Sequence, residues 1–249
     1  MGRRGNPVLL VAILAGAAVM QFVPRVSDYL AMTWMTVGLG GAVFLSLMLL
    51  EDRAQPRLDA LARFHWILLI VYLVHQFEEH GVDLLGRAYF FITYARTVIG
   101  DIGAASGFNL TPLAIYRTNT LFVWLSFLVA VWGHRRFIWQ GLAAAGLVLT
   151  NGILHIGIAL WRQEYNPGVG SAVALFLPTT LLYFRFVRQN CGVGWRGISG
   201  GVLFGAAEHG LLFLRIRFNL GPDMPPVALS IIALAPLIAN VIHKRWRGA

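Results

Sequence analysis

The sequence contains few charged residues and lacks the patterns of a soluble fold. Asp, Glu, Lys and Arg make up 12% of its 249 residues and 57% are apolar, with a mean hydropathy of +0.67. This composition is typical of a polytopic membrane protein. The apolar runs also lack the polar stripe of a soluble amphipathic helix, which argues against a soluble all-helical protein.

Period-2 alternation of apolar and polar residues is absent as well, which excludes the strands of a membrane barrel and leaves helices as the spanning elements. Eight apolar runs are present, at residues 7–23, 29–50, 64–85, 118–133, 138–161, 169–187, 197–216 and 226–243. We therefore predict an all-α, polytopic transmembrane bundle of about eight spans. The first run continues past its small residues to Pro24, so we expect it to be a retained helix and not a cleaved signal.

The net charge of +9 does not indicate a nucleic-acid partner, because the basic residues lie at the ends of the apolar runs and are not clustered. With the N-terminus in the cytoplasm, seven basic residues fall on the outer side: Arg25, Arg87, Arg96, Arg117, Arg162, Arg215 and Arg217. The other 13 of the 20 fall on the inner side, as the positive-inside rule requires. We therefore expect both termini in the cytoplasm.

A polar hexapeptide, HQFEEH at residues 75–80, interrupts the third apolar run. An acidic side chain at the bilayer centre costs roughly 3 kcal/mol. Four ionisable groups in six residues therefore need a metal ion, a proton pathway or facing polar side chains as partners. Residues three or four apart share one face of a helix. This spacing groups His75, Glu78 and Glu79 and directs His80 away from them.

Two other runs carry polar residues at a similar depth. Asn151 and His155 are four apart in the fifth run, and Glu208 and His209 interrupt the seventh. Counted from the inner ends of their runs, His75 and Glu208 each lie 11 residues in. Asn151 lies 13 and His155 17 residues in, so the groups fall within about 9 Å of one another in depth. We therefore predict one shared site.

The residue types of this site suit a metal. Imidazole and carboxylate ligands without a thiolate fit zinc, iron or manganese. We predict a divalent transition metal, zinc or iron, with ligands drawn from His75, Glu78, Glu79, His155, Glu208 and His209. One zinc with an open position for water and a two-metal centre both remain open. The HxxEE spacing differs from the HExxH of soluble zinc proteases.

Three motifs in this order resemble the HXXEE-motif family of bacterial membrane proteins: HQFEE at 75–79, NGILH at 151–155 and YNPG at 165–168. Asn119, at the start of the fourth span, resembles a further polar position of that family. The resemblance implies a polar site and a location in the bacterial inner membrane. It names no reaction, because the family has no settled activity.

The chain shows no internal repeat or low-complexity linker, so we predict a single membrane domain over residues 1–249. The resemblance covers roughly 64–190, which we take as the core. Two additional spans precede it in 1–63 and two follow it in 191–249. The single cysteine, Cys191, excludes an internal disulfide.

The outer side is where we expect substrate to bind. The region 86–117 combines aromatic residues and an occasional Arg with a Gly-rich polar stretch. This pattern predicts an interfacial helix followed by a loop over the outer face, which is either a lid or a solvated connection. Arginines suit an anionic head group. The predicted substrate-binding residues are Asn119, Arg162, Tyr165 and Arg215.

Three functions remain open. We favour a membrane-embedded metal-dependent hydrolase acting on a lipid-like substrate, in which Glu79 takes a proton from metal-bound water and Asn151 holds the developing oxyanion. A di-iron oxygenase or desaturase is an alternative, although the sequence has few histidines for it. A proton- or cation-coupled transporter would use Glu78, Glu79 and His155, but the paired halves of many transporters are not visible.

Overall fold

The computed structural model describes residues 11, 15–16, 19–54, 56–101, 110–133, 136–218 and 224–247. These residues form a helical bundle, and the one β-type contact among them is an isolated bridge between Val82 and Ala88. The prediction of an all-α fold is confirmed. Much of the predicted first span, 7–23, lies outside the described residues.

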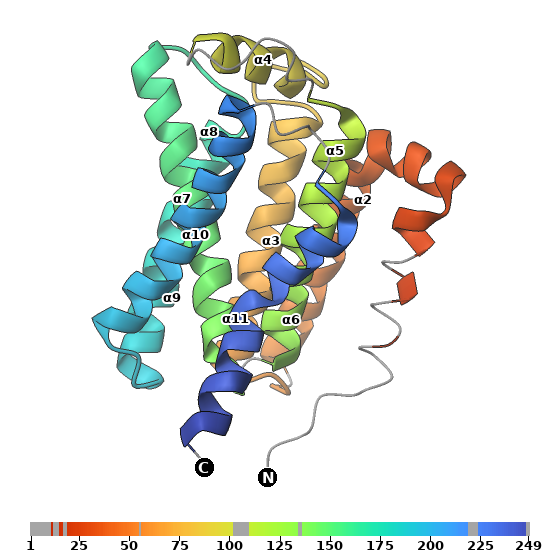
Figure 1. Ribbon diagram of the computed structural model, residues 1–249. Coiled ribbons are helices and arrows are strands. Elements are labelled where there is room, and N and C mark those ends of the chain that lie inside the picture. Colours follow the sequence, from red (N-terminus) through yellow and green to blue (C-terminus); the bar gives the residue numbers. More distant parts are fainter. Residues whose placement is uncertain are drawn as a thin grey trace.

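Figure 1 shows the elements in chain order: α2 (Pro24–Ala54), α3 (Ala60–His80), α4 (Phe91–Asp101), α5 (Pro112–Arg117), η1 (Thr118–Trp124), α6 (Leu125–Gly133), α7 (Ile138–Arg162), α8 (Val169–Ser171), η2 (Ala172–Phe176), α9 (Leu177–Asn190), α10 (Trp195–Arg217) and α11 (Pro226–Arg247). The elements η1 and η2 are π-helical stretches inside two longer helices, α5–η1–α6 and α8–η2–α9. Such stretches are rare and occur frequently at functional sites.

Six helices are long and apolar enough to cross a membrane: Pro24–Ala54, Ala60–His80, Pro112–Gly133, Ile138–Arg162, Val169–Asn190 and Trp195–Arg215. The apolar part of α11, Pro226–Ala239, is shorter. The predicted number of eight spans is therefore not confirmed by the described residues. Large apolar side chains on α2, such as Phe44 and Leu47, are exposed, as expected of a face that contacts lipid.

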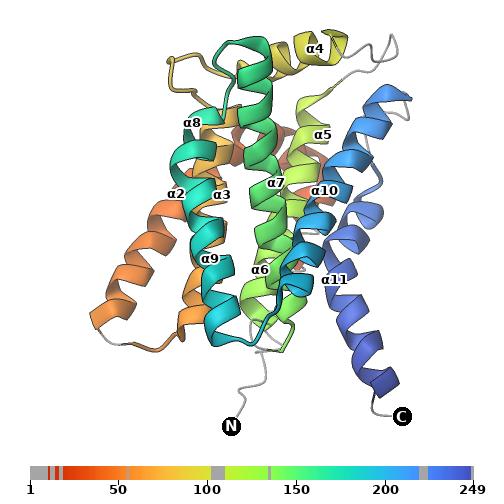
Figure 2. The ribbon, with the colours of Figure 1, turned by 90° about the vertical axis from the view of Figure 1, so that its left-hand side faces the viewer.

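The helix that carries the polar hexapeptide, α3, is buried along much of its length and contacts α2, α6, α7, α8 and α9. Its start is fixed by Asp59, whose carboxylate accepts a hydrogen bond from the backbone N of Ala62 at 2.9 Å. Nearby, Arg63 pairs with Asp52 of α2 at 2.8 Å. As predicted, α3, α7 and α10 run in one direction, toward the end covered by α4 (Figures 1 and 2).

Helices α7 and α10 pack backbone against backbone through glycines. A Cβ atom added at Gly146 of α7 would collide with the carbonyl group of Gly201. One added at Gly205 would collide with the carbonyl group of Gly146. Small residues four apart allow this approach between membrane helices. The close contact places the polar residues of α10 beside those of α7.

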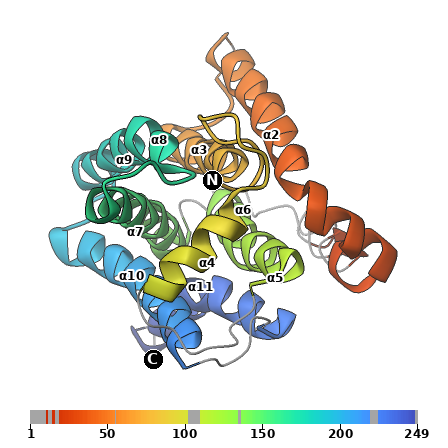
Figure 3. The same cartoon turned by 90° about the horizontal axis from the view of Figure 1, so that it is seen from above.

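Helix α4 lies across one end of the bundle, over α5 and α7 (Figures 2 and 3). Its last residue, Asp101, forms an ion pair with Arg162 at the end of α7. The guanidinium of Arg162 also lies 5.7 Å from the ring centroid of Tyr94. The structure therefore contains the predicted helix across this end. The loop predicted after it falls largely on 102–109, outside the described residues.

The glycine contact between α7 and α10 can be tested with two substitutions on the same helix. We expect Gly201→Ala to lower the free energy of unfolding by about 1–3 kcal/mol, the cost of forcing extra volume into a packed contact. Gly210→Ala is the matched control, because its Cβ would have nothing within 4 Å. Thermal unfolding in detergent measures both. Equal midpoints for the two variants would contradict the proposed packing.

Candidate functional site

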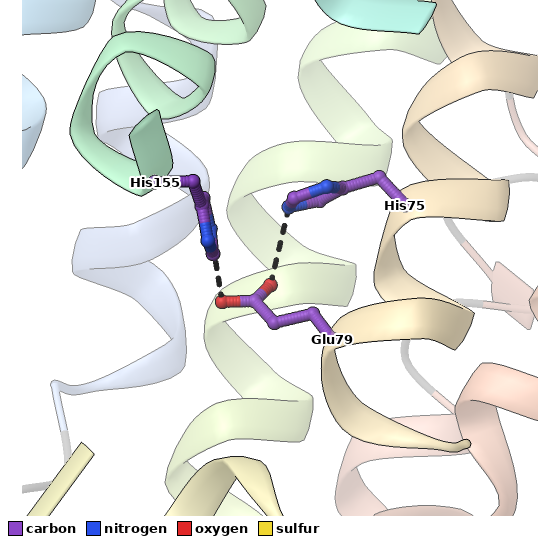
Figure 4. A group of neighbouring side chains, drawn as sticks. All are labelled: His75, Glu79 and His155. Carbon is purple, nitrogen blue, oxygen red and sulfur yellow. Dashed lines mark ion pairs between the residues drawn. The ribbon is translucent and has the colours of Figure 1, made fainter. Parts of the chain in front are cut away.

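His75, Glu79 and His155 form a buried cluster where α3 faces α7 (Figure 4). Glu79 lies between the two imidazoles. Its Oε2 is 3.5 Å from Nε2 of His75, and its Oε1 is 3.4 Å from Nε2 of His155. One ligand atom from each residue lies within 4.8 Å of the others. The prediction that the third and fifth spans share a polar site is therefore consistent with this arrangement.

The second nitrogen of each imidazole is held by a partner that must accept a hydrogen bond. The Ser171 hydroxyl donates to the carbonyl oxygen of Gly168 at 3.2 Å, so it accepts from Nδ1 of His75 at 2.9 Å. The Asn166 amide donates to the backbone oxygen of His155 at 2.6 Å. Its Oδ1 therefore accepts from Nδ1 of His155 at 2.7 Å. If both imidazoles are neutral, these contacts assign their protons to Nδ1 and leave a lone pair on each Nε2.

With both imidazoles neutral, the Nε2 atoms of His75 and His155 present lone pairs toward the carboxylate of Glu79. A charge-assisted hydrogen bond would bring nitrogen and oxygen to about 2.8 Å, below the separations of 3.4 and 3.5 Å. Ligands of a tetrahedral zinc, each 2.0–2.1 Å from the ion, lie roughly 3.3 Å apart. The two separations, each to a different oxygen of Glu79, are close to that value, and one ligand atom from each residue lies within 4.8 Å of the others. The donor set and its spacing therefore fit a metal ion.

His80 also contacts Glu79, although the helical spacing predicts that it points away. Its Nε2 lies 3.0 Å from Oε2 of Glu79. Neighbouring residues on an ideal helix point about 100° apart, but α3 ends here at Gly81, and the long Glu79 side chain reaches across. The imidazole of His80 is held between the rings of Trp34 and Phe91, at centroid distances of 5.2 and 4.4 Å.

Glu78 lies outside the cluster and binds the start of α8. Its Oε1 accepts from the Tyr165 hydroxyl at 2.8 Å and from the backbone N of Gly170 at 3.0 Å. Its Oε2 accepts from the backbone N of Ser171 at 2.7 Å. Burial raises the pKa of Tyr165, so the phenol remains a donor. Both predicted site residues, Glu78 and Tyr165, therefore support the helix start that orients Ser171.

The YNPG segment at 165–168, which by composition predicts a turn, also positions the imidazoles. Gly168 has a φ of +93°, a backbone conformation that favours glycine. A Cβ atom there would lie 2.7 Å from Cε1 of His75 and 2.9 Å from Cε1 of His155. Together with the hydrogen bonds of Asn166, this contact makes the turn part of the site.

A cavity of about 270 Å³ adjoins the cluster. Its lining is largely apolar and comes from α3, α4, α5, η1, α7, α10 and α11. The polar side chains that line it are Tyr72, Glu79, His80, Thr118, Asn119, Asn151, His155, Glu208, His209 and Arg215. Most of the predicted site residues are thus brought to one cavity. The predicted ligands Glu208 and His209 line it but are not part of the His75–Glu79–His155 cluster.

Two predicted polar residues in this lining are held by hydrogen bonds to their neighbours. The Nδ2 of Asn151 lies 3.4 Å from Nε2 of His209, whose Nδ1 donates to the carbonyl oxygen of Gly205 at 2.8 Å. The Oδ1 of Asn119 accepts from Nε2 of Gln76 at 2.7 Å. The amide nitrogen of Asn151 also lies 3.5 Å from the Tyr72 hydroxyl oxygen, so its N–H groups are directed to His209 and Tyr72.

The two arginines predicted to bind substrate differ in their placement. Arg162 does not line the cavity and pairs with Asp101 and Glu164. Its role in the structure is to hold α4 in place. Arg215 does line the cavity, two turns along α10 from Glu208.

Three side chains that support the cluster were not predicted from the sequence. Asn166 lies within the YNPG segment, so the motif itself carried a signal for it. Ser171 lies three residues after the motif, and a single small polar residue in an apolar run does not by itself indicate a site. His80 lies between Trp34 and Phe91, away from α7 as the helical spacing predicts, and it contacts the cluster because the Glu79 side chain reaches across to it.

Residues 66–183 match a family model described as "Protein of unknown function with HXXEE motif". Comparison with curated proteins and with solved structures gave no match. The matched segment contains the cluster and its supporting turn, and it leaves out α2, α10 and α11. We therefore assign residues 66–183 of this chain to the HXXEE-motif family, whose function is unknown.

Proposed function

We propose that the protein is an integral membrane metalloenzyme in which His75, Glu79 and His155 hold one divalent transition metal. The observation that carries this proposal is the position of a buried carboxylate between the Nε2 atoms of two imidazoles, at 3.4 and 3.5 Å. Nitrogen and oxygen donors without thiolate suit zinc and iron. We favour zinc, because His and Glu ligands with an open position are typical of catalytic zinc sites.

A hydrolytic reaction suits this donor set best. Three protein ligands with a fourth position open are typical of catalytic zinc sites, where the bound ion activates water near neutral pH and polarises carbonyl groups. Glu79 faces imidazoles with both oxygens, so we now assign it as a ligand and not as the general base. His80 contacts Glu79 and lines the cavity, so its imidazole is placed to act as the general base for water that enters the cavity.

The cavity supports a lipid-like or membrane-embedded substrate, because its lining is mainly aliphatic and aromatic. A mononuclear site is favoured over a di-iron oxygenase centre, since Glu78 is occupied by the start of α8 and Glu208 and His209 lie outside the cluster. A transporter would require no bound transition metal.

For the membrane arrangement we propose the topology with the most basic residues inside. Both termini then face the cytoplasm of a bacterial inner membrane, and α4 lies at the outer surface. Two features support this orientation. The basic residues are distributed 13 to 7 between the two sides, and α4 crosses the end at which α3 and α7 finish (Figure 2).

Elemental analysis of the detergent-purified protein tests the metal proposal. We expect close to one zinc per chain, reduced at least tenfold in His75→Ala and in His155→Ala, because each variant removes one of three ligands. Glu208→Gln should retain the wild-type metal content if the site is mononuclear. If the bound metal is iron with visible absorbance, the proposed reaction changes from hydrolysis to oxidation. A metal-free wild-type protein, after attempted reloading, would contradict the proposal and favour a transporter.

The support of His155 by Asn166 is tested by metal affinity. Loss of a partner that orients a ligand typically weakens metal binding 10- to 100-fold. We expect that loss in Asn166→Ala, measured by competition with a chelator. The control is Asn190→Ala, an exposed amide at the end of α9. Equal affinities in the two variants would show that Asn166 does not orient the ligand.

The proposed topology is tested with the single cysteine. Cys191 is exposed at the end of α9, on the inner side in this orientation. A membrane-impermeant maleimide should label it only after spheroplasts are permeabilised. In a Cys191→Ala background, Leu85→Cys places a thiol at an exposed position before α4, which should react in intact spheroplasts. The reverse pattern would invert the topology.

A further inference from the structure

The cavity presents a hydrogen-bond acceptor that no described residue satisfies. The Oδ1 of Asn151 is buried without a partner. The Nδ2 of Asn151 lies 3.4 Å from Nε2 of His209 and 3.5 Å from the Tyr72 hydroxyl oxygen. Nδ1 of His209 donates to the carbonyl oxygen of Gly205, so its Nε2 accepts, and this places the amide nitrogen of Asn151 toward His209. A residue that lines the cavity therefore carries an unmet acceptor.

A second acceptor lies on the adjacent helix. Glu208 lines the cavity from α10, and no described residue donates a hydrogen bond to its carboxyl group or forms an ion pair with it. Its neighbour His209 contacts Asn151, and both Asn151 and Glu208 line this cavity. An ionisable residue within a membrane helix is costly unless a partner satisfies it. Both groups call for a ligand that donates hydrogen bonds.

The remainder of the cavity beside Glu208 is apolar and reaches the surface. Leu211 and Leu212 line it and are 38% and 43% exposed. Leu229 and Ile232 of α11 complete this side. A molecule in the bilayer can therefore approach between α10 and α11 without crossing water.

We propose that the cavity binds a single-chain amphiphile with an uncharged or positively charged head that donates hydrogen bonds, such as a long-chain alcohol or amine. The head lies against Asn151 and Glu208, and the chain lies along the leucines of α10 and α11. This inference deepens the proposed function, on which it rests for calling the ligand a substrate. The carboxyl groups of Glu79 and Glu208 both line the cavity and disfavour an anionic head near them.

Three photoreactive probes of equal chain length, with an alcohol, an amine or a carboxylate head, test this proposal in nanodiscs. We expect the alcohol or the amine to label α10 and α11 at least tenfold more efficiently than the carboxylate, with sites mapped by peptide mass spectrometry. Asn151→Leu should reduce this labelling about tenfold, whereas Asn190→Leu should not change it. Leu212→Trp, which narrows the surface opening, should reduce labelling without removing a polar group.

Glu208→Gln distinguishes the two head groups, because it keeps an acceptor and removes the negative charge. If the wild-type protein prefers the amine and Glu208→Gln reduces that labelling tenfold, the ligand is an amine; if the wild-type protein prefers the alcohol and the variant leaves that labelling unchanged, the ligand is an alcohol. Either result supports the proposal. Preferential labelling by the carboxylate would show that Arg215 selects the head and would overturn it. Labelling that is indifferent to Asn151→Leu and Leu212→Trp would overturn it as well.

The probe assay needs neither metal nor turnover. It can be repeated on wild-type protein treated with a chelator, in which we expect the probe still to bind, because Asn151 and Glu208 are not part of the cluster. Failure of the metalloenzyme proposal would appear as absent metal with intact labelling. Failure of the amphiphile proposal would appear as intact metal with labelling that ignores the head group.

Discussion

The hydrogen bonds between Glu78 and the start of α8 are the interaction on which the rest of the site depends. This carboxylate accepts from the backbone of Gly170 and Ser171 and from the Tyr165 hydroxyl, so it satisfies donors that a helix start leaves open. It thereby fixes the turn that carries Asn166 and Gly168. The YNPG turn and the start of α8 carry the partners of Nδ1 on both imidazoles. These partners orient the rings so that Nε2 of each faces the carboxylate of Glu79. The two adjacent glutamates of the motif thus have different roles: Glu78 stabilises the start of α8, and Glu79 faces the histidines.

The fold class and the grouping of the site were accessible from the sequence. Hydropathy predicts helices, and counting residues from the helix ends places His75, Asn151, His155 and Glu208 at one depth; the structure brings these four to the cluster or to the cavity beside it. The helical period could not separate Glu78 from Glu79, because both lie near the face of His75. Their difference arises from what each meets: a helix start in one case and an imidazole of α7 in the other.

Other features depend on contacts that no local pattern encodes. The π-helical stretches η1 and η2 lie beside the cavity and beside His75, yet their sequences read as ordinary apolar helix. Arg162 is positively charged and close in sequence to the site, which favoured a role in substrate binding. Its pairing with Asp101 of α4 could be found only once the chain had folded across the end of the bundle.

The boundary of the family match has a consequence for how such a protein can diversify. All donors of the cluster lie within residues 66–183, whereas the apolar side of the cavity formed by α10 and α11 lies beyond them. The His75–Glu79–His155 cluster and the apolar α10–α11 side of the cavity are therefore encoded in separate stretches of the chain. Exchange of the last two helices could retune which molecule is accepted while the imidazoles, the carboxylate and their supporting turn remain unchanged.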